Sequence, residues 1–483
     1  MKRDFKEIGF IEDYFSGVVK IKGLPHVGFH EVLVDEKGKE KALVIGFDEE
    51  FVEALLFEED FDLSQPLFRS YQTFSLPKTN EYLGRILDGL ARPLDGLSPV
   101  RGEKKVSVFR EAPPVFKREP VKIPLITGIK VIDTCLPIGR GQRELIIGDR
   151  KIGKTTLALD TVLNQKNAKP PLFCVYVLIG QKKGQIEKII KILKEYGAMQ
   201  YTTIIASSSD DSFASQYLAP FVGCTIGEFF RDEGKDALLV YDDLTKHAKV
   251  WRDISLLLER PPGRESYPGD IFSLHAGLLE RASKISSKYG GGSLSALPIV
   301  ETQEGDITGY IPTNLISITD GQIYLERGLF QKGFLPAVNI GLSVSRVGSQ
   351  AQPSPLKEVT KNLRLFLSWH RELQKLAQFE TKISISAKRK IQRGELILEI
   401  LKQKKHFLLS WQEEVVLFFS VEEGVFDDIS KKDWKIFEEM LIEALRTKFF
   451  FIEKEIEKEG LSEKVKEKIK NFVKEFKKDF LKK

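Results

Sequence analysis

Cysteine is scarce in this sequence, which contains only Cys135, Cys174 and Cys224 among its 483 residues. The three are far apart, none belongs to a CxxC pair, and Cys174 and Cys224 have apolar neighbours. A disulfide framework or a cysteine metal site would need a recognisable spacing, so buried and reduced thiols are the favoured interpretation.

Long hydrophobic runs are also missing. The longest, such as residues 171–180, have about half of the roughly 20 apolar residues that a helix needs to cross a bilayer. Residues 1–6 carry charges and no apolar stretch follows them, so no secretory signal is expected. We therefore expect contact with a membrane only through partner proteins.

A strong excess of one charge is the third absence. The 74 basic and 69 acidic side chains leave a formal net charge of +5, so the overall charge predicts no nucleic-acid partner by itself. With 42% hydrophobic and 30% charged residues, a chain of this length can bury two or three separate cores. The composition thus predicts a folded protein with several domains.

Three regions with different patterns follow one another along the chain. Residues 1–73 contain short runs rich in Val, Ile and Phe between turn sequences, which predicts a small β-barrel. In residues 74–352, buried strand-like runs alternate with helical patterns, which predicts an α/β core with a RecA-like parallel sheet. Residues 353–483 begin with a Pro-Ser-Pro linker and are expected to form a helical domain. Their last, Lys-rich amphipathic segment could bind a membrane or an anionic partner, but a solvated helix face is favoured.

The clearest chemical motif is a phosphate-binding loop. Residues 148–155 fit GxxxxGK[ST] between a predicted strand and a predicted helix, and they read Gly148, Asp149, Arg150, Lys151, Ile152, Gly153, Lys154 and Thr155, followed by Thr156. The glycines allow a tight turn that points backbone N–H groups at phosphate, at the positive end of the helix dipole. Lys154 is expected to bind the β- and γ-phosphates, and the Thr155 hydroxyl Mg²⁺. The alternative is an ordinary glycine turn with a surface lysine.

A second apolar run, residues 237–241, ends in Asp242 and Asp243. A carboxylate at the end of such a strand can hold the water shell of Mg²⁺ opposite the phosphate loop, because this ion prefers an octahedral set of oxygen ligands. Strands that end in aspartate are common in any parallel sheet, so this interpretation depends on the phosphate loop. We predict that Asp242 holds Mg²⁺ through water.

Gln181 follows the strand after the phosphate-loop helix. Nucleotide hydrolases on this kind of sheet generally need a carboxylate that polarises the attacking water, and a missing general base typically costs about 10²- to 10⁴-fold in rate. An amide cannot accept that proton. From the residues alone, Gln181 is equally compatible with an ordinary surface position.

Several segments resemble the alpha subunits of F-type ATP synthases, in the ATPase alpha/beta chains family. These segments are residues 139–150, 179–182, 216–220, 255–258, 260–265, 311–322 and 336–349. The resemblance extends from about Gly9 to the C-terminus and is strongest between residues 128 and 352. It implies a regulatory subunit that binds ATP or ADP with Mg²⁺ but does not turn it over. The complex would make ATP from ADP and phosphate with a transmembrane proton or sodium gradient.

The resemblance also assigns roles to single residues. Arg346 matches the arginine that reaches into the catalytic site of the adjacent beta subunit, where a fixed guanidinium supplied in trans is worth about 10³- to 10⁵-fold. Ser317 matches a residue of the same interface, Gln181 replaces the catalytic glutamate of beta subunits, and Gln403 matches an adenine-pocket glutamine. The alternative for Arg346 is an ordinary loop salt bridge.

The same resemblance implies the assembly. Three copies would alternate with three beta subunits around a gamma shaft, held by a delta and b stator, on the cytoplasmic side of a bacterial inner membrane and without nucleic acid. Four residues depart from the family pattern and leave nucleotide affinity and base preference open: Lys151, Ile152, Leu335 and Lys405. Residues 380–383 replace an acidic turn that meets the shaft, and no helical extension precedes the predicted barrel, so the stator attachment is open.

Other classes of function remain as alternatives. Against an export ATPase or a catalytic beta-type subunit stand Gln181, the setting of Arg346 and the lack of an acidic C-terminal signature. A Rho-type RNA translocase would need basic and aromatic residues in the barrel, where residues 49–50 and 58–60 are acidic. A related motor with another mechanical use would account for the departures.

Overall fold

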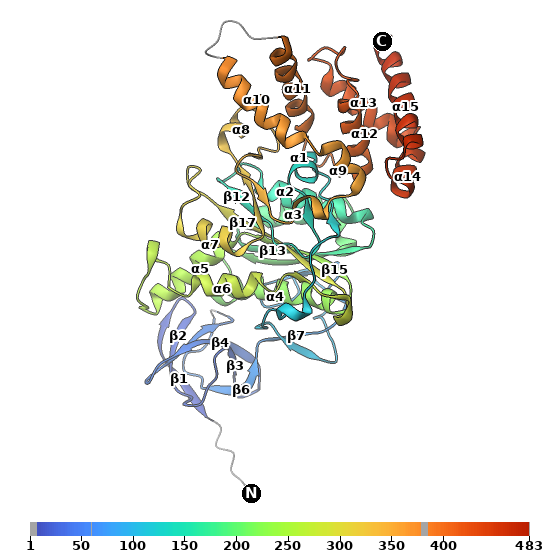
Figure 1. Ribbon diagram of the computed structural model, residues 1–483. Coiled ribbons are helices and arrows are strands. Elements are labelled where there is room, and N and C mark those ends of the chain that lie inside the picture. Colours follow the sequence, from blue (N-terminus) through green and yellow to red (C-terminus); the bar gives the residue numbers. More distant parts are fainter. Residues whose placement is uncertain (1–6, 59, 378–384, 483) are drawn as a thin grey trace. The chain divides into compact units, whose positions relative to one another are not determined.

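The computed structural model describes residues 7–58, 60–377 and 385–482 (Figure 1). The described residues form two compact units. The first contains the residues up to Pro120 together with Arg140–Arg150 and Lys166–Asp320. The second contains Val121–Gly139, Lys151–Gln165 and the residues from Gly321 onward. The chain thus crosses between units several times, and the predicted domain limits 1–73, 74–352 and 353–483 stay predictions.

The first unit begins with a closed barrel of six antiparallel strands, in the order β1-β2-β5-β4-β3-β6. The strands are β1 (Ile8–Phe15), β2 (Val18–Gly23), β3 (Glu31–Val34), β4 (Glu40–Phe47), β5 (Val52–Leu56) and β6 (Leu67–Thr73). Alternate residues such as Val19, Ile21 and Val44 fill the interior, as the period of two in a strand requires. The predicted small barrel is confirmed.

A mostly parallel sheet forms the centre of the same unit. Its parallel strands, in spatial order, are β12 (Leu145–Gly148), β17 (Ser293–Glu301), β15 (Asp236–Asp242), β13 (Leu172–Gln181), β14 (Thr202–Ser208) and β8 (Ile86–Leu87). The short β16 (Ser283–Lys284) pairs antiparallel with β17. Nearly all residues of these strands are buried, because helices cover the sheet. The predicted parallel sheet is confirmed.

Five helices of the first unit accompany this sheet: α3 (Lys183–Glu195), α4 (Phe213–Asp232), α5 (Leu244–Leu257), α6 (Ile271–Leu279) and α7 (Tyr310–Ile318). α3 buries Ile186, Ile189 and Leu193 on one face, because residues three to four positions apart share a face of a helix. Figure 1 shows α4, α5 and α6 between the sheet and the barrel. Parallel strands end at a common edge, so the residues after β12, β13 and β15 gather there.

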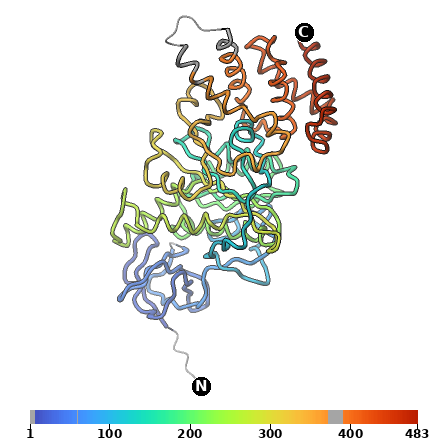
Figure 2. The backbone as a smooth tube through the Cα atoms, in the orientation of Figure 1, coloured from blue at the N-terminus to red at the C-terminus, as the bar shows by residue number. Residues whose placement is uncertain are grey.

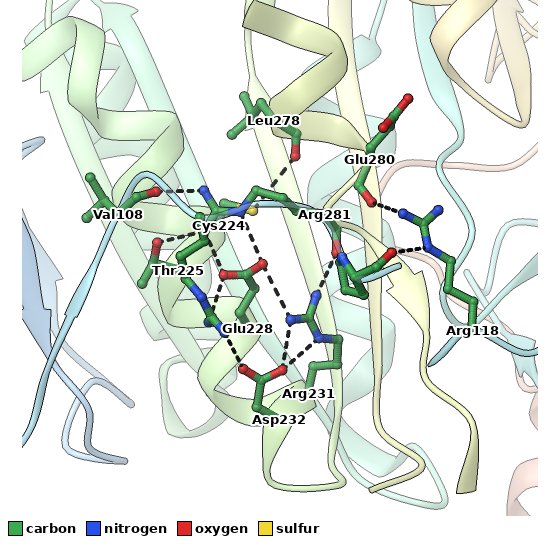
Figure 3. A network of polar contacts seen from close by, with 12 residues as sticks. Val108, Arg118, Cys224, Thr225, Glu228, Arg231, Asp232, Leu278, Glu280 and Arg281 are labelled. Carbon is green, nitrogen blue, oxygen red and sulfur yellow. Dashed lines mark hydrogen bonds and ion pairs between the residues drawn. The ribbon is translucent and has the colours of Figure 1, made fainter. Parts of the chain in front are cut away.

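A buried network of charges fixes α4 (Figure 3). Arg281 is 1% exposed and donates to both carboxylate oxygens of Glu228 and, at 2.7 Å, to the Val108 carbonyl. Arg231 donates to the Arg281 carbonyl at 2.6 Å, and Arg110 to Glu228 at 3.0 Å. Every buried charge here has an opposite partner, which is the condition under which such groups are tolerated in an interior.

The second unit is mainly helical. Its short elements are β10 (Pro124–Leu125), α1 (Lys130–Cys135), β11 (Ile138–Gly139), α2 (Lys154–Leu163), β18 (Gly321–Leu325), α8 (Arg327–Gln331), β19 (Val344–Ser345) and α9 (Ser354–Thr360). The later helices are α10 (Leu363–Ala377), α11 (Ile385–Leu401), α12 (Trp411–Glu422), α13 (Trp434–Thr447), α14 (Phe450–Glu459) and α15 (Glu463–Leu481). The predicted helical C-terminal region is confirmed.

Several helices of this region pack closely. α10 and α11 run side by side (Figure 2). A Cβ added at Gly394 would lie only 2.4 Å from the His370 ring, so glycine permits this approach. α15 buries Val465, Ile469, Phe472 and Val473, while Lys468 and Lys477 pair with Glu455 and Asp428. These lysines therefore serve contacts within the unit.

Two of the three features that are scarce in the sequence, cysteines and long apolar runs, can be examined in the structure. Cys135, Cys174 and Cys224 are buried and free, as predicted, and burial raises the pKa of each thiol. Among the described residues, no helix combines the length and the apolar character needed to cross a bilayer.

Candidate functional site

The phosphate loop connects β12 to α2, as the motif predicted. Gly153 is the N-cap residue of α2 at φ +106°, and no side chain caps the helix, so the positive end of the helix dipole lies at the phosphate loop without a capping side chain. Lys151 also has a positive φ, +62°, a conformation that costs on the order of 1–3 kcal/mol outside glycine. Backbone strain in this loop is thus concentrated at a residue that departs from the family pattern.

The residues after Gly153 provide groups suited to a phosphate and its metal ion. Lys154 is 6% exposed, and Thr155 and Thr156 are half-buried in the first turn of α2. A lysine and uncapped N–H groups fit a phosphate, and a hydroxyl oxygen fits Mg²⁺. No group of three or more His, Cys, Asp or Glu side chains in the described ranges could hold a metal ion.

The first residues of the loop contact the sheet of the first unit. The Asp149 carboxylate accepts hydrogen bonds from the Thr302 hydroxyl at 2.6 Å and from the Gly305 N–H at 2.8 Å. Arg150 is largely exposed, with its Nε 3.3 Å from the Glu301 carboxylate. Asp149 therefore holds the start of the loop to the segment that follows β17.

Gln181 and Asp242 meet at the ends of β13 and β15. The Gln181 amide donates to the Asp242 Oδ1 at 2.9 Å and to its carbonyl at 3.1 Å, while its oxygen accepts from the Lys246 Nζ at 2.6 Å. The Tyr176 hydroxyl donates to the other Asp242 oxygen at 3.1 Å. The sequence patterns predicted Gln181 and Asp242 as site residues. They did not indicate Lys246 and Tyr176, which belong to no recognised motif.

This arrangement fixes the chemical character of the strand ends. The amide of Gln181 lies between a carboxylate and an ammonium group, so it is held in one orientation and offers no proton acceptor. Asp243 is the N-cap residue of α5, where its side chain accepts from the Lys246 N–H at 2.8 Å. Burial raises the pKa of Asp243 to about 7. Both aspartates are thus engaged within the unit.

The two residues predicted for a subunit interface are exposed. Ser317 lies on α7 and donates to the Thr313 carbonyl at 3.0 Å. Arg346 follows β19, and its guanidinium forms no hydrogen bond or salt bridge with any residue that the structure describes. Ser345, just before it, donates to the Pro137 carbonyl at 2.8 Å and accepts from the Gly348 N–H at 3.2 Å. The backbone beside Arg346 is therefore fixed while its charge remains available.

Gln403, predicted for the adenine pocket, is 7% exposed and bonded to the backbone of its own unit. Its amide nitrogen donates to the carbonyls of Gly128 at 2.7 Å and Phe407 at 2.6 Å, and its oxygen accepts from the Lys130 N–H at 2.9 Å. Both amide hydrogens are thus used. Lys405 is exposed, and the Leu335 carbonyl accepts from the Gln403 N–H at 2.7 Å. The predicted shaft contact at residues 380–383 lies outside the described residues.

Comparison with protein families gives two matches. Residues 128–345 match the nucleotide-binding domain of the ATP synthase alpha/beta family. Residues 352–476 match the C-terminal domain of the ATP synthase alpha/beta chain. The two matched regions contain the phosphate loop, Gln181, Asp242 and Gln403, and Arg346 comes directly after the end of the first region.

Curated relatives resemble the chain over almost its whole length. ATP synthase subunit alpha of Aquifex aeolicus is 46% identical over 453 residues, which cover 93% of this chain and 90% of that protein. The protein of the same name from Neorickettsia sennetsu is 48% identical over 432 residues, 88% of this chain and 85% of its own length. That of Helicobacter acinonychis is 45% identical over 455 residues, 94% and 90% of the two chains.

Proposed function

This chain belongs to the ATP synthase alpha/beta family, as an alpha-type subunit of an F-type ATP synthase, and from that premise we propose the roles of its residues. Residues 148–156 hold a nucleotide, ATP or ADP, with Thr155 as a ligand of Mg²⁺ and Asp242 as a ligand through water. Arg346 acts in the catalytic site of an adjacent beta subunit, and Ser317 lies in the interface with it.

The observation that carries the proposal is the position of Gln181. Its amide occupies the end of β13, between Asp242 and Lys246, where a hydrolase needs a carboxylate. The N–H groups of α2 and the Lys154 ammonium bind phosphate oxygens, and Mg²⁺, when bound, neutralises phosphate charge. Without a proton acceptor, water near the γ-phosphate is not activated. The site therefore retains its nucleotide.

Arg346 supports the second half of the proposal. Its side chain is exposed on a fixed loop and has no partner among the described residues of its own chain. This argues against the ordinary loop salt bridge. A guanidinium held by its backbone and free at its tip can stabilise charge that develops on phosphate in a neighbouring subunit.

The assembly follows from the same family. We propose a ring in which three copies of this chain alternate with three beta subunits around a gamma shaft, with a delta and b stator. The chain is then a peripheral component on the cytoplasmic side of a bacterial inner membrane, attached through the complex. The driving ion, proton or sodium, is set by the membrane ring.

The test of Arg346 uses the complex assembled from this chain with its beta and gamma subunits. Arg346→Ala should lower steady-state ATP hydrolysis by about 10³-fold or more, because the trans guanidinium is lost. Nucleotide binding to this chain should be unchanged. Arg101→Ala, which removes an exposed arginine of the other unit, is the control and should retain normal turnover. Near-normal turnover of the Arg346 variant would refute the assignment.

The test of the phosphate loop uses Lys154→Ala in the same complex. Loss of the ammonium should weaken Mg-ATP binding to this chain, while appreciable catalysis remains because the chemistry takes place in the beta subunit. Equilibrium binding to the purified chain and turnover of the complex are measured side by side. Complete loss of turnover would mean that this chain's own site performs hydrolysis.

A further inference from the structure

Helix α2 carries the proposed phosphate-binding N–H groups at its start and a buried carboxylate in its middle. Asp160 is 6% exposed and lies six residues after Lys154, roughly 9 Å along the helix axis. Its Oδ1 is 2.6 Å from the His406 Nδ1, and its Oδ2 accepts from the His406 N–H at 3.2 Å. One residue thus binds both oxygens of the carboxylate.

The backbone of His406 explains how it does so. Its φ is +61°, in the left-handed region that few residues other than glycine adopt. In this conformation the N–H and the ring of His406 both reach the same carboxylate. Such a conformation persists only where the surroundings hold it, so His406 is fixed by the loop that contains it.

That loop, residues 402–410, which we term the clasp loop, is bonded to several other elements of the second unit. Gln403 bonds to the Lys130 N–H and the Gly128 carbonyl, and the Leu409 N–H donates to the Gly128 carbonyl at 3.1 Å. The Lys130 Nζ donates to the Lys402 carbonyl at 3.0 Å and forms a buried ion pair with Glu438 on α13.

The end of the clasp loop leads into the last helices. Ser410 and Glu413 form a capping box at the start of α12. Arg446 of α13 donates to the Leu408 carbonyl at 2.7 Å and pairs with Glu413. The clasp loop is therefore connected to α12 and α13 by direct hydrogen bonds.

The far end of α2 is held as well. Asn164 and Gln165 both donate to the Ile126 carbonyl, at 3.0 and 2.8 Å. α2 is thus attached at its middle and its end to segments of the second unit, and its start is the phosphate loop. The position of the phosphate-binding N–H groups follows from these attachments.

We propose that Asp160 and His406 are positioning residues that couple nucleotide occupancy of the phosphate loop to the clasp loop and, through it, to α12 and α13. The inference rests on the proposed nucleotide-binding function and names two residues that act on it from outside the motif. Coupling of this kind is reciprocal: if the clasp favours the bound position of α2, bound nucleotide strengthens the clasp.

The test compares His406→Ala with His406→Asn in the purified full chain, with Mg-ATP as the probe. The asparagine amide keeps a donor near the place of the Nδ1, whereas alanine removes it. We expect the alanine variant to bind Mg-ATP about fivefold or more weakly, and the asparagine variant within about twofold of the wild type. Asp160→Asn should resemble the alanine variant, and the double variant should be no weaker than either single one.

A second measurement separates positioning from simple stabilisation. Hydrogen exchange of the amides in residues 402–410 should slow when Mg-ATP binds the wild type, and should not respond in His406→Ala. If that variant does not fold, Asp160→Asn is judged by the same criteria. The proposed coupling would be refuted if all variants bound Mg-ATP equally well and Mg-ATP did not change hydrogen exchange in residues 402–410. No binding by the wild type, or equal binding by Lys154→Ala, would instead refute the nucleotide site.

Discussion

Two buried histidines show how the interior of the first unit depends on protonation. The His247 Nε2–H donates to the Tyr217 carbonyl at 3.0 Å, so its Nδ1 is the acceptor for the His275 Nε2–H at 3.2 Å. This pattern is that of two neutral rings. Burial lowers the pKa of His247 to about 4 and that of His275 well below its usual value.

The consequence is a loss of stability in acid. Between pH 6.5 and about 4, the two histidines are protonated in the unfolded chain but stay neutral in the folded protein. The free energy of unfolding therefore falls as the pH falls. His275→Gln keeps a donor towards His247 and removes one titrating group. Urea unfolding at pH 8 and pH 5 should show a pH-dependent loss smaller by on the order of 1–2 kcal/mol than in the wild type. If His275→Gln lost as much stability between pH 8 and pH 5 as the wild type, the neutral histidine pair would not be the cause of the pH dependence.

The sequence identified the types of the site residues better than their contacts. Gln181 and Asp242 were found because each follows a recognisable strand, and the structure brings them together. Lys246 and Tyr176, which hold them, are a lysine in a helix and a tyrosine in a strand, and neither carries a local signal. Gln403 is hydrogen-bonded to Gly128, at a sequence separation of 275, and His406 to Asp160, at a separation of 246. These contacts depend on tertiary packing.

At the scale of elements, α4 approaches the sheet closely at Gly223. A Cβ added at Gly223 would be 2.2 Å from the Val177 Cγ2 of β13. Gly223→Ala should therefore destabilise the chain by about 1–3 kcal/mol, through overpacking against a rigid strand. Gly184→Ala on α3, where nothing lies within 4 Å, is the matched control and should be neutral or slightly stabilising. Equal effects of both changes in urea unfolding would contradict the close contact.

Element types were predictable because their patterns are strong. Continuous apolar runs such as β15, alternating runs in the barrel and the helical spacing in α3 each satisfied a simple geometric rule. The membership of elements in units was not predictable. α2 follows directly from a strand of the first unit, yet its buried contacts with residues 126 and 406 place it in the second.

At the scale of the molecule, the division into two compact units predicts two separable unfolding events. Glu228 lies in the first unit and pairs with Arg281. Glu414 lies in the second, where its carboxyl is fully buried without a hydrogen-bond partner among the described residues. Burial, with the nearby Asp133, raises the pKa of Glu414 well above its usual value. Stability therefore falls as the pH rises above about 4.5, where only the unfolded chain loses this proton readily.

Calorimetry of the isolated chain tests this division. Glu228→Gln should lower the free energy of unfolding in one transition by about 3–5 kcal/mol, because it leaves buried arginine charge without its partner. Glu414→Met should raise the free energy of unfolding in a different transition by about 1–3 kcal/mol, because an unsatisfied buried acid is replaced by an apolar side chain. The increase should be larger at pH 8 than at pH 5. A single transition that both changes shift would contradict separate unfolding of the two units.

The role proposed for Arg346 would make its contribution measurable only in the assembled complex. Because its guanidinium has no partner within the described part of its own subunit, a survey of variants for solubility or heat resistance should rank every replacement at this position as harmless. A survey scored by growth on a respiratory substrate should rank the same replacements among the most damaging. The gap between the two rankings would locate residues that a protein maintains for its neighbours.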